Sequence, residues 1–264
     1  MTALFLPAWR YRNFILSSIK NEFMTRFVRS RLGGLWIALN PLAQVAIYAL
    51  ILSAVMKAKI SGVDNKYAYA IYLMAGMLAW SLFTEVFGRC TSIFIDNRNL
   101  IKKIAFPKIA LPLIVTGSAL INNLALFTAM FIVFGALGHL PSLTTLWLAP
   151  LTVLTLGIAI GLGLSLGIIN VFIRDIGQAV PIILQFWFWL TPVVYRTEML
   201  PEEYRGLLLL NPITGIVMSY QNILVYSKSP DISVLLYPVL IAALMLGISL
   251  YLYQRASNEM ADAL

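Results

Sequence analysis

Glu85 and Arg89 are the ionisable side chains best placed to do chemistry in this sequence. They lie four residues apart, in and next to a long apolar run, and share a face if the run is helical. A charge at the centre of a membrane costs about 2.5 to 3.5 kcal/mol and is usually retained for a use such as a proton relay. We favour a carboxylate paired locally near the end of its helix, and Arg174-Asp175 similarly indicates a helix boundary.

Other catalytic and metal-binding patterns are missing from the sequence. The single cysteine, Cys90, cannot form an internal disulfide, and the single histidine, His139, leaves no Cys/His cluster for a metal ion. No HExxH, GxSxG or Walker A motif occurs, and the glycine-rich stretch 161–167 lacks the Lys-Ser/Thr pair of a phosphate loop. We therefore expect no catalytic residue, no metal and no cofactor in this chain.

The composition indicates a membrane protein with several spans. Of its 264 residues, 60% are hydrophobic and 11% are charged, and the mean hydropathy is +0.86. So few polar residues could not coat a soluble globule of this size. The net charge of +8 is spread over the connections between apolar runs, which favours contact with anionic lipid and argues against nucleic-acid binding.

The apolar runs predict an all-α fold with six transmembrane helices in a single domain covering 1–264. A run of about 20 apolar residues is long enough to cross the hydrocarbon core as a helix. In the fourth run, small residues recur every four positions on two faces, which predicts close packing against neighbouring helices. The predicted spans cover 35–56, 68–88, 110–137, 143–173, 179–195 and 232–253.

The distribution of Lys and Arg sets the orientation. With six spans and the N-terminus inside, the cytoplasmic segments hold 13 of the 19 basic residues, in accord with the positive-inside rule. Residues 1–34 are then cytoplasmic, and the apolar periodicity within 9–30 predicts an amphipathic helix in the membrane interface. The stretch 207–226 contains Asn211-Pro212 and further amides, so we expect it to be re-entrant or to form short buried helices, although charge does not exclude a seventh span.

Residues 97–112 form a basic, proline-marked segment on the cytoplasmic side. A protein that moves cargo without its own nucleotide site depends on an ion gradient or on a separate motor, and a gradient-driven transporter is expected to show broken helices in matching positions of two repeats. No such repeat is evident. A plain positive-inside loop explains the charges of this segment but not the apolar residues between them, so motor docking and a plain loop both remain open.

Four motifs resemble those of the permease subunits of bacterial polysaccharide ABC exporters, in the type-2 ABC exporter family. They are LGGLWIALNPL at 32–42, NLIKKIAFPK at 99–108, LTPVVY at 190–195 and LNP at 210–212, and they occur in the family's order. The resemblance implies a homodimeric channel of six-span subunits in the bacterial inner membrane, with both termini cytoplasmic. It also implies two copies of a separate ATPase, which would bind ATP and Mg, docked below the membrane.

The resemblance implies roles for particular residues. In that family the segment matching 97–112 is a coupling helix seated in the ATPase, and the region matching 200–228 forms periplasmic gate helices. The cargo is a glycan on a lipid carrier, typically undecaprenyl diphosphate for O antigen. The implied coupling residues are Arg98, Leu100, Ile101, Lys102, Lys103, Ile104, Phe106, Pro107 and Lys108, and the implied gate residues are Asn211, Pro212 and Gly215.

Two further sets of residues could handle such a cargo. Basic side chains of the N-terminal helix could bind the diphosphate, although lipid anchoring explains them equally well. Aromatic side chains could stack on sugar faces, although aromatic belts at the membrane interface explain those residues too. The basic set is Arg26, Arg29 and Arg31, and the aromatic set is Trp80, Trp187, Phe188, Trp189 and Tyr195.

We therefore expect the membrane subunit of an ATP-driven exporter of lipid-linked polysaccharide. O antigen is the first cargo to consider, and a capsular or teichoic-type polymer is the second. Two other functions remain open: a gradient-driven transporter, which would work without a partner ATPase, and a membrane-embedded glycan-modifying enzyme. The enzyme would need a catalytic acid, for which Glu85 is the candidate.

Overall fold

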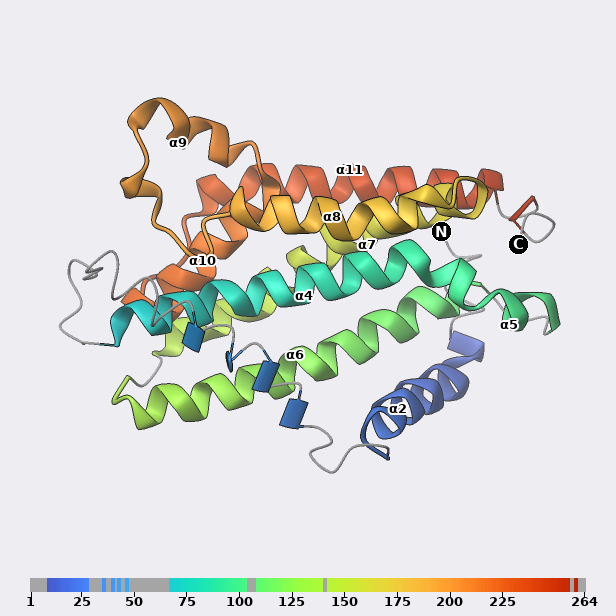
Figure 1. The fold of residues 1–264 in the computed structure, drawn as a ribbon, viewed down its shortest axis with the longest axis horizontal. Helices are drawn as coiled ribbons and strands as arrows, with labels where there is room; N and C mark the ends of the chain where they lie inside the picture. The colour runs from blue at the N-terminus through green and yellow to red at the C-terminus, as the bar shows by residue number, and fades with distance from the viewer. Residues whose placement is uncertain are drawn as a thin grey trace.

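The computed structural model describes residues 9–28, 35–36, 39–40, 42–43, 46–47, 67–103, 108–139, 142–256 and 259–260. Within these residues the chain folds into helices and contains no strand, which confirms the predicted all-α fold. The long helices run side by side along the longest axis of the molecule (Figure 1). Two 3-10 helices, η1 (Leu143–Trp147) and η2 (Thr197–Met199), precede α7 and α9. The α-helices are α2 (Arg12–Val28), α4 (Ala68–Asp96), α5 (Arg98–Lys103), α6 (Ala110–Ala136), α7 (Leu148–Phe172), α8 (Asp175–Trp189), α9 (Glu202–Leu209), α10 (Pro212–Tyr226) and α11 (Ile232–Ala256).

Helix α4 is the centre of the bundle. It packs against α6, α7, α8 and α10, and Leu73, Phe83 and Cys90 along its length are fully buried. Helix α11 differs, because many of its apolar side chains, such as Leu236 and Leu240, are exposed and few are fully buried. Exposed apolar side chains of this kind are expected where lipid rather than water surrounds the helix.

Small residues of α7 allow two neighbours to approach closely. A Cβ added to Gly163 would lie 2.6 Å from the Cβ of Cys90 and 2.8 Å from the carbonyl oxygen of Phe87, both in α4. On another face, a Cβ added to Gly161 would lie 2.7 Å from the backbone of Met245 in α11. Because such separations leave no room for a side chain, the two small-residue faces are confirmed as packing surfaces.

Four helical segments are long and apolar enough to cross a membrane among the described residues: α4, α6, η1 continued by α7, and α11. Helices α9 and α10, bent by 103° at the break between them, add a fifth only if the pair is counted as one span. The predicted first span, 35–56, lies mostly outside the described residues. The chain is thus a multi-pass membrane protein, while the count of six spans stays a prediction.

Helix α8 accounts for only part of the predicted fifth span, 179–195. It has 15 residues and ends at Trp189, and the chain continues in turns. Pro192 explains the ending, because a proline has no N–H to donate and disfavours helical geometry in the residue before it. Helix α2 falls within the predicted interfacial helix, and its position in a membrane stays a prediction.

Candidate functional site

The predicted coupling segment begins as a direct extension of α4. Asn97 alone separates α4 from α5, and its carbonyl oxygen accepts hydrogen bonds from the backbone N–H groups of Leu100 and Ile101, both at 3.0 Å. The Asn97 side chain donates to the carbonyl oxygen of Ile93 at 2.8 Å. These bonds tie α5 to the last turns of α4.

The side chains of α5 lie in two environments. Leu100 and Ile101 are half-buried and pack against the core, whereas Arg98 and Lys102 are exposed. The described part of the segment therefore presents cations outward. Of the other predicted coupling residues, Lys108 is half-buried, and Ile104, Phe106, Pro107 and the side chain of Lys103 lie outside the described residues.

A group of polar side chains joins α2, α4 and α6 near this end of the bundle. The guanidinium of Arg89 lies 2.7 Å from the Glu22 carboxylate of α2 and 3.4 Å from Glu85. Asn122 of α6 donates to Glu85 at 2.6 Å, and Ser118 donates to Glu22 at 2.8 Å. The predicted local pairing of Glu85 is confirmed, but spacing along one helix could not reveal the partners from α2 and α6.

Irregular backbone at 190–195 is held by polar side chains of two helices. Tyr69 and Tyr72 of α4 donate their hydroxyl groups to carbonyl oxygens of this segment at 2.7 and 3.0 Å. Gln221 of α10 donates to another carbonyl at 2.9 Å. Non-helical backbone at membrane depth must find its hydrogen-bond partners inside the protein. These three side chains provide such partners for carbonyl oxygens of the segment. Only the presence of polar groups in apolar runs hinted at them in the sequence.

Asn211 connects α8 to α10. Its Oδ1 accepts hydrogen bonds from the indole N–H of Trp187 and from the backbone N–H of Ile213, both at 3.0 Å. Its Nδ2 donates to the Thr191 hydroxyl at 2.9 Å. Pro212 follows in the first turn of α10. A backbone N–H at this position would have no intrahelical acceptor, so the lack of one in proline costs the helix no hydrogen bond. One side chain thus caps α10 and holds the end of α8.

Gly215, the third predicted gate residue, lies where α10 crosses α11. A Cβ on Gly215 would be 3.0 Å from the carbonyl oxygen of Val234. That oxygen has no intrahelical N–H to accept, because Pro238 stands four residues further along α11. A cavity of 300 Å³ beside this crossing is lined by Asn211 and Tyr237, among others. The predicted gate residues therefore lie together, and their opening stays a prediction.

The aromatic candidates occupy different environments. Trp80 and Phe188 are buried, with ring centroids 5.7 Å apart. Trp187 is half-buried and packs edge-on against α4. Trp189 is 59% exposed, and Tyr195 is half-buried. Of these five side chains, that of Trp189 is the most open to a ligand without rearrangement of the bundle.

The predicted head-group site lies largely beyond what the structure describes. Arg26 belongs to α2, but its side chain is not described, and Arg29 and Arg31 fall outside the described residues. In the described part of the chain, no group of three or more His, Cys, Asp or Glu side chains is arranged to hold a metal ion.

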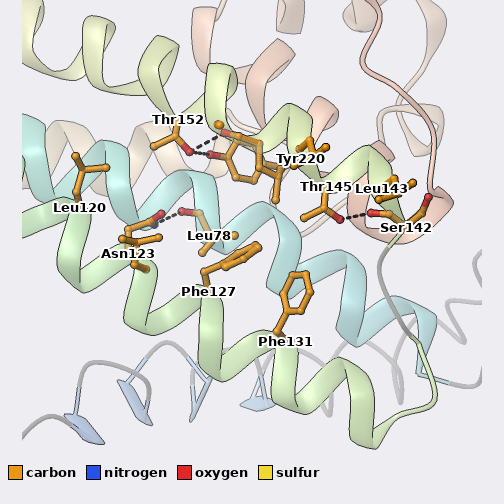
Figure 2. Close-up of a pocket in the computed structure, with 14 residues that line it drawn as sticks. Leu78, Leu120, Asn123, Phe127, Phe131, Ser142, Leu143, Thr145, Thr152 and Tyr220 are labelled. Carbon is orange, nitrogen blue, oxygen red and sulfur yellow. Dashed lines mark hydrogen bonds between the residues drawn. The ribbon is translucent and has the colours of Figure 1, made fainter.

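An apolar cavity of 460 Å³ lies between α6 and α7. Figure 2 shows Phe127 and Phe131 of α6 on one side, with Leu143 of η1 and Thr152 of α7 on the other. The hydroxyl groups of Thr152 and Tyr220 lie 2.9 Å apart at its wall. The lining comes from five separate elements, α4, α6, η1, α7 and α10, so no single stretch of sequence predicts the cavity.

Comparison with known proteins agrees with the motifs. Residues 14–225 match the family of ABC-2 type transporters. The chain is 28% identical to the O-antigen export system permease protein RfbA of Myxococcus xanthus, with 100% of both chains covered. It is 27% identical to an RfbA of Klebsiella pneumoniae over 76% of each chain, and 23% identical to the polysialic acid transport protein KpsM of Escherichia coli over 90% of this chain and 92% of the relative. The family match covers α5, segment 190–195 and Asn211, and the chain belongs to the ABC-2 type transporter family.

Proposed function

We propose that this chain is the permease subunit of an ATP-driven exporter that moves lipid-linked polysaccharide, O antigen in the first place, from the cytoplasm to the periplasm. The observation that carries the proposal is the similarity to an O-antigen export permease over the full length of both chains. The multi-pass helical bundle supports it. The sequence contains no nucleotide-binding motif, so a partner subunit would bind ATP and Mg and hydrolyse the nucleotide.

In this proposal the permease is a homodimer in the bacterial inner membrane, with both termini in the cytoplasm and two ATPase subunits docked at α5. The excess of basic residues on one side supports that orientation. The exposed cations Arg98 and Lys102 support contact with a partner. Because only Asn97 separates α5 from α4, a displacement of α5 would act directly on the central helix of the bundle.

The proposed path of the cargo runs from the N-terminal helix to the far end of the bundle. Arg26, Arg29 and Arg31 would bind the diphosphate of an undecaprenyl carrier. The exposed ring of Trp189 offers a stacking face for sugar. Its neighbours in α8, Trp187 and Phe188, are less exposed, so the bundle would have to rearrange before they could stack on sugar. Asn211 would control a periplasmic gate, because its bonds to Trp187 and Thr191 hold α8 and α10 together.

Replacement of Phe106 with Asp tests the docking of the ATPase. We expect the Phe106→Asp permease to insert normally but to lose both co-purification with the ATPase and ATP-dependent export. Leu143→Asp is the matched control, because Leu143 is an 86% exposed apolar residue at the opposite end of α6; it should retain both. Unchanged co-purification and export in Phe106→Asp would contradict the proposal.

Export of a capsular polymer is the second candidate, because the chain also resembles a polysialic acid transport protein over 90% of its length. Disruption of the gene in its own host separates the two. Loss of O antigen with the capsule intact supports the first candidate, and the reverse result supports the second. Transport that persists without any ATPase would instead support a gradient-driven transporter, and a glycan modification abolished by Glu85→Gln would support an enzyme.

A further inference from the structure

Five polar side chains form a chain of four contacts that joins three helices to one another at the α5 end of the bundle. Arg89 of α4 contacts Glu22 of α2 at 2.7 Å and Glu85, one turn earlier in α4, at 3.4 Å. Asn122 of α6 donates to Glu85 at 2.6 Å, and Ser118, one turn before Asn122, donates to Glu22 at 2.8 Å. We call these five residues the polar ring. Each of the three helices is bonded to the other two.

The polar ring is partly shielded from solvent. The side chains of Arg89, Glu22 and Glu85 are 25%, 26% and 26% exposed, and Ser118 and Asn122 are buried. Partly buried ion pairs are screened less than surface pairs, and removal of one partner leaves a charge without compensation. The ring therefore favours one fixed spacing of α2, α4 and α6.

An apolar contact beside the ring fixes α2 on α6 a second time. The side chain of Ile19 in α2 lies over Gly117 in α6, and its Cδ1 occupies the place that a Cβ on Gly117 would need. Gly117 directly precedes Ser118, so the packing contact and the hydrogen bond to Glu22 hold α2 at adjacent positions of α6. Together they join α2 to α6, beside which it lies in Figure 1.

The polar ring also lies close to α5. A cavity of 350 Å³ is lined by Glu22 and Arg89 of the ring, by Phe14 of α2 and by Leu100 of α5. Because this cavity separates part of α2 from α5, packing between the two helices is incomplete, and the route from α5 to α2 runs through α4 and Arg89. Arg89 lies about two turns before the end of α4.

We propose that the polar ring couples the docking segment to the N-terminal helix, so that α5, α2 and the adjoining ends of α4 and α6 move as one rigid unit. Arg89 is the positioning residue of that unit. The inference rests on the proposed function, because it takes ATPase movement at α5 as the input. Its consequence is that the N-terminal helix and its basic residues move with the spans during each cycle and do not stay fixed at the membrane surface.

The first test replaces Arg89 with Gln in the reconstituted permease–ATPase complex. We expect the complex to assemble and hydrolyse ATP, while polysaccharide exported per ATP falls on the order of tenfold, within the usual range of coupling between sites. Arg255→Gln is the matched control, since Arg255 is an exposed cation near the end of α11 whose guanidinium donates to the Tyr251 hydroxyl at 3.2 Å. Unchanged export per ATP in Arg89→Gln overturns the proposal.

The second test links α2 to α6 by a disulfide between Ile19→Cys and Gly117→Cys, in a Cys90→Ala background that removes the native cysteine. With the ring intact, the oxidised protein should export as well as the reduced one, because the joined helices already move together. A disulfide that blocks export with the ring intact overturns the proposal.

The two tests distinguish failure of this inference from failure of the proposed function. If the wild-type complex exports nothing when ATP is supplied, the proposed function fails. If the wild type exports and Arg89→Gln exports as much polysaccharide per ATP as the wild type does, only the coupling role of the ring fails. Should Arg89→Gln not accumulate in the membrane, the disulfide with the ring intact decides the question alone.

Discussion

The indole N–H of Trp187 donates to the side-chain oxygen of Asn211 at 3.0 Å, so a residue near the end of α8 is bonded to the residue that caps α10. The same oxygen accepts the backbone N–H of Ile213, and the amide nitrogen of Asn211 donates to Thr191. One asparagine therefore sets the position of two helices at the proposed gate.

Replacement of Asn211 with Ala should destabilise this junction. The lost cap is expected to cost about 0.5–2 kcal/mol, and each buried group left unpaired adds about 1–3 kcal/mol. Asn222→Ala is the control, because the side chain of Asn222, also half-buried in α10, makes no hydrogen bond shown within the described residues. Thermal unfolding of the detergent-purified proteins measures the difference. Equal unfolding temperatures for the two variants would contradict the role of Asn211.

Removal of the Tyr69 hydroxyl should loosen the segment 190–195. Tyr69 donates to the carbonyl oxygen of Val194 at 2.7 Å, and Val194 is buried, so Tyr69→Phe leaves that oxygen unpaired at a cost of about 1–3 kcal/mol. Tyr226→Phe should change little, since the structure shows no hydrogen bond from the Tyr226 hydroxyl within the described residues. Hydrogen exchange of 190–195 in both variants provides the measurement, and faster exchange in Tyr226→Phe than in Tyr69→Phe would refute the assignment.

A methyl group on Gly167 should disrupt the packing of α7 against α4. The added Cβ would collide with the backbone oxygen of Cys90, and overpacking of this kind typically costs about 1–3 kcal/mol. A Cβ on Gly157 would meet Ala242 at an ordinary 3.4 Å, and alanine favours helix over glycine by up to about 1 kcal/mol. We therefore expect Gly167→Ala to unfold at a lower temperature than wild type and Gly157→Ala at an equal or higher one. The opposite order would show that the α4–α7 spacing is adjustable.

Local periodicity made the helices and the small-residue faces of α7 predictable. Apolar runs long enough to cross a bilayer are readable directly from hydropathy, and a pair four residues apart, such as Glu85 and Arg89, meets on any helix. The close packing at Gly161 and Gly163 was predictable in the same way, since small residues at four-residue spacing form a flat face on a helix. The helical nature of these stretches required no knowledge of tertiary structure.

Contacts between distant parts of the chain were beyond that reasoning. No spacing rule brings Glu22 of α2 to Arg89 of α4, and none assigns the hydroxyl of Tyr69 to a carbonyl following α8. Trp187 illustrates the same limit, because a sequence indicates an aromatic residue but not whether its N–H is already bonded to Asn211. Such partners are set by which helices are neighbours, and neighbours depend on the whole fold.

Acidification should fray the start of α11 through Asp231. The hydroxyl and backbone N–H of Ser233 donate to the Asp231 carboxylate at 2.7 and 2.9 Å, and these bonds hold the pKa of Asp231 below its ordinary value of 3.8. Because the folded-state pKa is the lower one, the carboxylate stabilises the helix start fully above the unfolded pKa, and this contribution is lost as pH falls through the folded-state pKa.

The matching measurement is hydrogen-exchange protection of the first turn of α11, corrected for the intrinsic rate at each pH. Wild type should lose protection on the acid side of 3.8. Asp231→Asn should keep its protection across that range, because an amide oxygen still accepts from Ser233 but does not titrate. Asp231→Ala should be weakly protected at every pH. If Asp231→Asn lost protection along the same pH curve as wild type, a different group would control the fraying, and the hydrogen bonds to Ser233 would not be its cause.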